Sequence, residues 1–182
     1  MRYIKINPQN RNADEKFVNE KGLYEILSEY CTNNAHIIEA GPDVGPWTPI
    51  LLEHIAHVKG YDIYWAGFEK TGLDWKKKNE YSDGVLFNQD ICTLPISTEN
   101  ADLALSIRPR VYGVAHTAQG ELINKQHMKL LSLLKAGGYL IIMIHKSEHS
   151  LVEPFWAKGT PGFTFVKCVE AGPSKISVIR KG

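Results

Sequence analysis

The segment His36–Thr48, which reads H-I-I-E-A-G-P-D-V-G-P-W-T, constrains the fold of this chain more than any other segment. Its two isoleucines are typical of the end of a buried strand. Gly41 and Gly45 indicate a turn, and the apolar residues after Thr48 indicate a helix. Such a unit places backbone N–H groups at the start of a helix, where they bind nucleotide-like ligands. Because Glu39 ends the strand, we expect a ligand that carries an ammonium group, since a carboxylate repels a pyrophosphate.

The rest of the chain alternates between predicted strands and helices. This alternation predicts a parallel sheet with helices on both faces, and two short runs joined by a Gly-Pro turn predict a C-terminal antiparallel hairpin. Gly22 weakens the first helix, and Gly137-Gly138 are expected to end the last one. The predicted helices cover residues 13–30, 47–58, 70–80 and 119–135, and the predicted strands cover 61–68, 85–87, 101–107, 139–144, 163–169 and 175–179, in addition to the strand before Gly41. The expected fold class is therefore α/β, a three-layer α/β/α sandwich around a mostly parallel seven-stranded sheet.

The length and composition indicate one globular domain of ordinary core size. The chain has 182 residues, 43% of them hydrophobic, and we expect a polar N-terminal arm at 1–12 and a single domain at 13–182. With 21 basic and 20 acidic residues, the overall charge does not indicate a general binder of nucleic acid or of a membrane surface. No stretch reaches the roughly 18 apolar residues of a membrane span. Three widely separated cysteines, with no targeting run, predict reduced thiols in a cytoplasmic protein.

Two segments carry a resemblance to a known family. E-A-G-P-D-V-G resembles the first motif of class I S-adenosylmethionine-dependent methyltransferases, an acid followed by glycines at the third, fifth and seventh positions. Gly41 and Gly45 match the third and seventh, and Asp43 replaces the middle glycine. The segment L-L-K-A-G-G-Y-L-I-I at 133–142 is similar to the L-L-K-P-G-G-x-L segment before the fifth strand of that family. The resemblance covers about residues 13–182 and implies a class I methyltransferase-like fold.

The resemblance also implies the cofactor, S-adenosyl-L-methionine, and the residues that hold it. The acid and glycines after the first strand would bind the methionine end, and an acid after the second strand would accept the ribose hydroxyls. An acid and an apolar residue after the third strand would contact the adenine. Trp47 would lie near the methionine moiety, although core packing explains it as well. The predicted cofactor-binding residues are Glu39, Gly41, Asp43, Gly45, Trp47, Glu69, Asp90, Ile91 and Ser106.

Other nucleotide ligands fit the sequence less well. It lacks the G-x-G-x-x-G of nicotinamide enzymes and the G-x-x-x-x-G-K-[ST] of phosphate loops. A structural glycine turn in another doubly wound protein remains open as an alternative.

The methyl acceptor is not identified by any motif. Enzymes that act on exocyclic amino groups usually carry [DNS]-P-P-[YFW] after the fourth strand, where this chain reads S-I-R-P-R-V-Y. Ribose 2′-O-methyltransferases carry an Asp there, which is absent, paired with a Lys for which Lys146 is suitably placed. A small molecule, RNA or a protein all remain open as acceptors, and the basic run at 75–78 is a candidate RNA contact or simply a solvated face. The candidate catalytic residues are Arg108, Tyr112, His116 and Lys146.

Two further readings of the sequence bear on function. The segment H-K-S-E-H at 145–149 matches H-x-x-E-H, but that zinc signature needs both histidines on one helix, and His145 ends a predicted strand. We therefore expect no metal site. The missing motif after the fourth strand leaves open a protein that binds S-adenosylmethionine without transferring a methyl group, such as a regulatory subunit or degenerate relative. An oligomer or a partner subunit also remains open.

Overall fold

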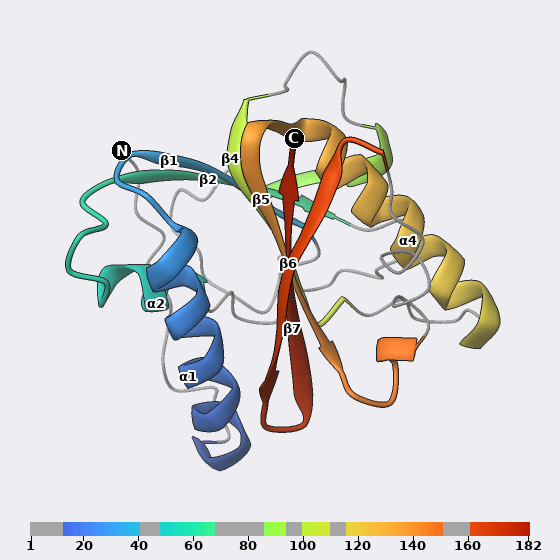
Figure 1. Cartoon of the computed structure of the whole chain (residues 1–182), viewed down its shortest axis with the longest axis horizontal. Coiled ribbons are helices and arrows are strands. Elements are labelled where there is room, and N and C mark those ends of the chain that lie inside the picture. The colour runs from blue at the N-terminus through green and yellow to red at the C-terminus, as the bar shows by residue number, and fades with distance from the viewer. Residues whose placement is uncertain (1–12, 41–47, 68–85, 94–99, 110–115, 151–160) are drawn as a thin grey trace.

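A single mixed sheet organises the chain (Figure 1). The computed structural model describes residues 13–40, 48–67, 86–93, 100–109, 116–150 and 161–182. The strands are β1 (Ala35–Ala40), β2 (Tyr61–Gly67), β3 (Leu86–Asp90), β4 (Ala101–Ile107), β5 (Leu134–His145), β6 (Phe163–Ala171) and β7 (Ser174–Lys181). They lie in the order β3-β2-β1-β4-β5-β7-β6, in which β1 to β5 are parallel and β7 is antiparallel to both of its neighbours.

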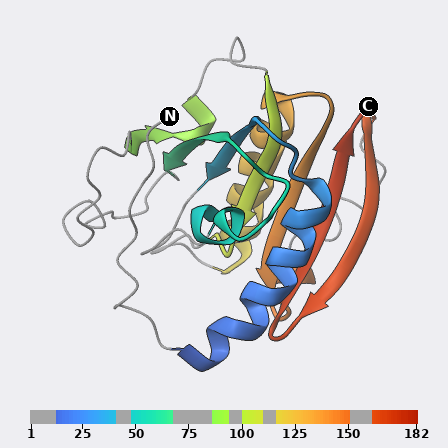
Figure 2. The same cartoon turned by 90° about the vertical axis from the view of Figure 1, so that its left-hand side faces the viewer.

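Helices cover both faces of this sheet in the part of the chain that the structure describes. The described helices are α1 (Ala13–Tyr30), α2 (Thr48–Glu53), α4 (His116–Leu133) and the short 3₁₀ turn η2 (Ile91–Thr93). Figures 1 and 2 show α1 and α2 on one face and α4 on the other. The predicted mixed α/β fold with a C-terminal antiparallel hairpin is therefore confirmed. The predicted helix at 70–80 and the arm at 1–12 lie outside the described residues, so the complete three-layer sandwich stays a prediction.

Two apolar clusters hold the helices to the sheet. Successive side chains of a strand point to opposite faces, so Ile37 of β1 joins the cluster under α1 and α2, and Ile38 joins the cluster under α4. In β4, Leu105 belongs to the cluster under α1 and α2, and Ala104 belongs to the cluster under α4. Strands that are apolar on both faces are typical of a parallel sheet between helices.

The second helix is shorter than the sequence predicted. The pattern predicted a helix over 47–58, but α2 ends at Glu53. The amides of His54 and Ile55 donate to carbonyl groups only three residues earlier, so the chain tightens out of the α-helix there. Ile55 and Val58 are nevertheless buried, which explains why the apolar period continued past the end of the helix.

The boundary between α4 and β5 also differs from the prediction. The helix ends at Leu133, and Gly137-Gly138 lie inside β5 instead of ending the helix. The register of β5 against β4 shifts at this point, and Gly137 has a φ of 78°. A Cβ on Gly138 would lie 3.0 Å from the carbonyl oxygen of Asp102. The two glycines therefore permit an irregular strand start against β4.

Gly22 lies inside α1 because the helix packs closely against the hairpin. A Cβ at this position would lie 2.6 Å from the Cβ of Ala171, the last residue of β6. The residue that weakened the helix prediction thus permits the close approach of helix and strand.

Candidate functional site

The carboxyl ends of the parallel strands meet at one edge of the sheet, which we call the C-terminal edge. There Ala40 of β1 is level with Ala66 of β2 on one side and with Ser106 of β4 on the other. Gly67 of β2 is level with Asp90, the last residue of β3. The strand order reverses between β1 and β4, and ligands of open α/β sheets bind outside the strand ends at such a reversal. The candidate site therefore lies around the ends of β1 and β4.

Glu39 is a buried carboxylate at this point. Its side chain is only 2% exposed, and it shares the α1 and α2 face with Ile37 because the two are separated by two positions in β1. The Thr48 hydroxyl, at the first turn of α2, donates a hydrogen bond of 3.0 Å to Glu39 Oε1. A carboxylate at this strand end has the chemistry to bind a positively charged group of a ligand.

Ser106 faces the opposite side of the sheet. It is two residues from Ala104, which packs under α4, and its Oγ lies 2.9 Å from Nε2 of His127 on that helix. Burial lowers the pKa of His127 to about 3, so the imidazole is neutral at pH 7. Glu39 and Ser106, both predicted to bind the cofactor, therefore lie at one edge but point to different faces.

Arg108 has an unusual backbone conformation just after β4. Its φ is 50°, in the left-handed region that residues with a Cβ rarely adopt. Its amide donates a 2.7 Å hydrogen bond to the carbonyl of Met143 in β5. This bond extends the pairing between the two strands by one residue beyond the end of β4. Sparsely populated backbone conformations of this kind cluster at ligand sites.

Lys146 lies beside the hairpin turn. Its Nζ is 2.7 Å from Oε2 of Glu170, and its amide donates to the carbonyl of Pro173 at 2.8 Å. The hydrogen bond from Lys146 lowers the pKa of Glu170. Because β6 runs parallel to β5, this pair also lies at the C-terminal edge, on the far side of β4 from β1.

The two histidines of the H-x-x-E-H segment contact different groups. His145 is the last residue of β5, as predicted, and its Nδ1 lies 2.7 Å from the Ser147 hydroxyl. His149 Nε2 lies 3.8 Å from Sγ of Cys168 on β6. Across the described residues, no group of three or more His, Cys, Asp or Glu side chains is arranged to hold a metal.

The remaining predicted site residues are described in part or not at all. Ile91 is fully buried in the cluster under α4. His116 is the first residue of α4. The predictions that lie outside the described residues are those for Gly41, Asp43, Gly45, Trp47, Glu69 and Tyr112.

Sequence reasoning missed two buried polar residues, Thr48 and His127. Each had a signal: Thr48 is a hydroxyl residue between the glycine turn and an apolar helix, and His127 is four residues from both Ile123 and Leu131 on the apolar side of α4. A polar residue in a run of buried positions needs a hydrogen-bond partner. The identity of that partner depends on the tertiary fold.

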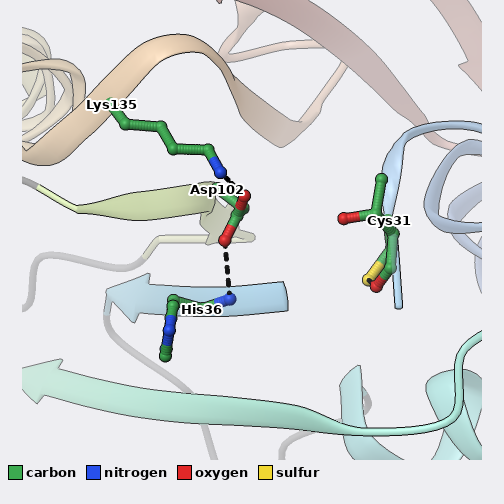
Figure 3. Close-up of polar contacts among 5 residues, drawn as sticks. Cys31, His36, Asp102 and Lys135 are labelled. Atoms are coloured by element: carbon green, nitrogen blue, oxygen red, sulfur yellow. Dashed lines mark hydrogen bonds and ion pairs between the residues drawn. The ribbon is translucent and has the colours of Figure 1, made fainter. Parts of the chain in front are cut away.

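The opposite, N-terminal edge of the sheet holds a different polar group (Figure 3). The Asp102 carboxylate accepts a 2.9 Å hydrogen bond from the amide of His36 and forms an ion pair with Lys135. Burial raises the pKa of Asp102, but the bonds from Lys135 and the His36 amide outweigh it, so the pKa is lowered overall. Nearby, burial and then the charge of Asp102 raise the pKa of the Cys31 thiol to about 11. This thiol is therefore protonated and unreactive at pH 7.

The fold is shared with solved methyltransferase structures. The chain is similar to TrmN from Thermus thermophilus, with 17% identity and a TM-score of 0.61 over 90% of this chain, and it spans 48% of the TrmN chain. It is similar to an rRNA methylase from Streptococcus thermophilus, with 16% identity and a TM-score of 0.59 over 88% of this chain and 94% of that one. It is also similar to the N-methyltransferase NodS from Bradyrhizobium japonicum WM9 in complex with S-adenosyl-L-homocysteine, with 16% identity and a TM-score of 0.60 over 96% and 91% of the two chains.

These similarities establish the class I methyltransferase fold, which the sequence resemblance predicted. No protein-family model matches the sequence, and comparison with curated proteins finds no similar sequence. Among the described residues, no helix has the length and apolar character needed to cross a membrane.

Proposed function

We propose that this protein binds S-adenosyl-L-methionine at the C-terminal edge of its sheet and catalyses transfer of the methyl group to an acceptor. One observation carries the proposal: a buried carboxylate, Glu39, at the point where strand order reverses in a class I methyltransferase fold. The ammonium of the methionine moiety is complementary to it. Gly41, Asp43 and Gly45 would bind the rest of that moiety.

The other predicted cofactor contacts follow the strand ends. Glu69, which comes two residues after β2, would accept the ribose hydroxyls, and Asp90 at the end of β3 would accept a hydrogen bond from the adenine amino group. Ile91 would form part of the apolar wall, together with Trp47 on the methionine side. Ser106 would act from beneath the site, since its hydroxyl is bonded to His127 on the α4 side of the sheet.

When bound, S-adenosylmethionine would supply a methyl group on a sulfonium sulfur. The bond between the methyl carbon and sulfur breaks during transfer, and both of its electrons stay on sulfur. The protein has to hold the acceptor atom in line with that methyl group and, where needed, remove its proton. Arg108 and Lys146 follow β4 and β5 and are suited to holding an anionic or polar acceptor. Tyr112 and His116, on the segment after β4, are the candidates for proton removal.

The acceptor class is open between a small molecule, RNA and a protein. Among the structures with this fold, one is named an rRNA methylase and another an N-methyltransferase. The net charge of +1 supplies no general attraction to nucleic acid. Within this chain, the segments after β4 and β5 and the N-terminal arm are the candidates for selecting the acceptor.

Calorimetric titration tests the proposal. We expect micromolar dissociation constants for S-adenosylmethionine and S-adenosylhomocysteine, and much weaker binding of NAD and ATP. Glu39→Gln should weaken the first two at least tenfold, because it removes a charge-assisted hydrogen bond. Glu121→Gln, an exposed substitution on α4, serves as the matched control and should not change binding. Failure of both adenosyl ligands to bind the wild-type protein would overturn the proposal.

A second candidate function is binding of S-adenosylmethionine without methyl transfer. It is favoured by the sequence S-I-R-P-R-V-Y after β4, which matches none of the usual acceptor motifs. Screening acceptors with methyl-labelled cofactor separates the two, since a regulatory protein would bind the cofactor and transfer no label to RNA, protein or small-molecule fractions.

A further inference from the structure

A hydrogen bond joins the two residues that enclose the glycine segment 41–47. The Thr48 hydroxyl donates to Glu39 Oε1 at 3.0 Å. Both side chains are removed from solvent, with Thr48 0% and Glu39 2% exposed. The bond therefore forms where water cannot compete for either partner, and it connects the end of β1 to the start of α2.

Helix capping does not account for this bond, because capping uses the lone pairs of the hydroxyl oxygen and this bond uses its proton. A capping threonine accepts a hydrogen bond from a backbone amide of the first helical turn. Here the hydroxyl donates its proton to a carboxylate, and a hydroxyl has only one proton to donate. Thr48 thus constrains the orientation of the carboxylate group through a donor that carries no charge of its own.

We propose that Thr48 is a positioning residue, which orients Glu39 to receive the ammonium group of the methionine moiety. The inference rests on the proposed function of the same site. An ionised carboxylate offers about four lone-pair positions, and the Thr48 hydroxyl occupies one of them. A neutral donor at that position orients the group and adds no positive charge that would compete with an ammonium ligand. A lysine there would neutralise the carboxylate before the ligand arrived.

Two ligands distinguish a positioning role from a purely structural one. S-adenosylhomocysteine carries the ammonium group, whereas 5′-methylthioadenosine has the adenosine and the sulfur but lacks the amino-acid portion. Thr48→Val removes the hydroxyl at nearly constant volume. The substitution should lower the affinity for S-adenosylhomocysteine by about tenfold to a hundredfold. The affinity for 5′-methylthioadenosine should stay within about twofold of the wild-type value. Thr48→Ser keeps the hydroxyl and should bind both ligands as the wild type does.

The controls separate the possible failures. Thr32→Val, an exposed substitution before β1, should change neither affinity. In a Glu39→Gln background, Thr48→Val should add little further loss, because the two residues act through one contact. Thermal unfolding checks that each variant is folded, and Thr48→Ala replaces Thr48→Val if the valine variant is not.

Three results would overturn the inference. Unchanged binding of S-adenosylhomocysteine by Thr48→Val would do so while leaving the proposed function intact. Equal loss for both ligands would assign Thr48 a structural role. If the wild-type protein binds neither ligand, the proposed function fails and the inference fails with it.

Discussion

The two ends of the parallel strands carry polar groups with different kinds of partner. At the N-terminal edge, the Asp102 carboxylate is paired with the cation of Lys135 and the amide of His36. At the C-terminal edge, the Glu39 carboxylate is held by a neutral hydroxyl. Ser106 at the same edge is bonded to a histidine that is neutral at pH 7.

This difference separates stabilising groups from groups prepared for a ligand. A carboxylate that is paired with a cation on a neighbouring strand contributes to folding and has little capacity left for a ligand. The hydroxyl that bonds to Glu39 brings no charge of its own, and Glu39 lies at the edge where ligands bind in such sheets. Substitutions at the two edges should therefore differ in their effects on stability, pH dependence and cofactor affinity.

The largest expected effect concerns His127 and acidic pH. Its pKa is about 3 in the folded protein and near 6.5 when unfolded, so the unfolded state binds more protons between these values. Stability should therefore fall as pH decreases from about 6.5, by up to about 1.4 kcal/mol per pH unit from this residue. Urea unfolding of wild type and His127→Gln between pH 7 and 4.5 should show a smaller slope for the variant. Equal slopes would contradict the account, and His54→Gln, an exposed histidine, is the control.

The packing of α1 against the hairpin gives the next largest effect. Gly→Ala inside a helix normally stabilises a protein, but Gly22→Ala would place a Cβ 2.6 Å from that of Ala171. We expect a loss of about 1–3 kcal/mol in the free energy of unfolding. Ala171→Gly in the same chain should restore most of it, as measured by urea unfolding. A stabilising Gly22→Ala would mean that helix and hairpin are not in close contact.

Asp102 tests the N-terminal edge. Its pKa is lowered in the folded protein. Its contribution to the free energy of unfolding is therefore present above the unfolded-state pKa near 3.9, and it is lost as the pH falls through the folded-state pKa. Asp102→Asn should reduce stability at pH 7 by about 1–2 kcal/mol, and the difference from wild type should shrink at acidic pH. S-adenosylhomocysteine affinity should not change. The control is Asp62→Asn, because the Asp62 side chain is 70% exposed. A large loss of affinity in Asp102→Asn would show that the N-terminal edge also takes part in ligand binding.

The smallest effect is expected from the backbone of Arg108. Because its φ is 50°, glycine fits this position without steric strain and alanine does not. Arg108→Gly should be more stable than Arg108→Ala by about 1 kcal/mol. Thermal unfolding measures the difference, and both variants lack the guanidinium, so the comparison isolates the backbone. Equal stability would indicate that the strain is absent.

The sequence predicted the elements whose cause is local. Runs such as A-D-L-A-L-S-I are apolar on both faces, and β4 covers the predicted residues 101–107. The end of α2 was missed because buried Ile55 and Val58 continue the helical period after the helix has ended. The position of Gly137-Gly138 was missed because the same dipeptide fits a helix stop and an irregular strand start.

For the candidate site, the sequence indicated the strand ends and not the contacts around them. Glu39 was found because its motif is contiguous. Its bond to Thr48, and the Ser106–His127 pair, depend on how separate elements pack, which no local pattern specifies. Gly22 could not be explained from the sequence for the same cause, because a glycine there is required by close packing against Ala171, which is far along the chain.

The central claim is that ligand binding belongs to the C-terminal edge. Adding S-adenosylhomocysteine to isotope-labelled protein and following backbone amide NMR signals tests it residue by residue. We predict large shifts at Ala40, Ala66 and Ser106, which lie level with one another at that edge, and little change at His36 and Lys135 at the other. Shifts concentrated at the N-terminal edge, or none at saturating ligand, would contradict the account.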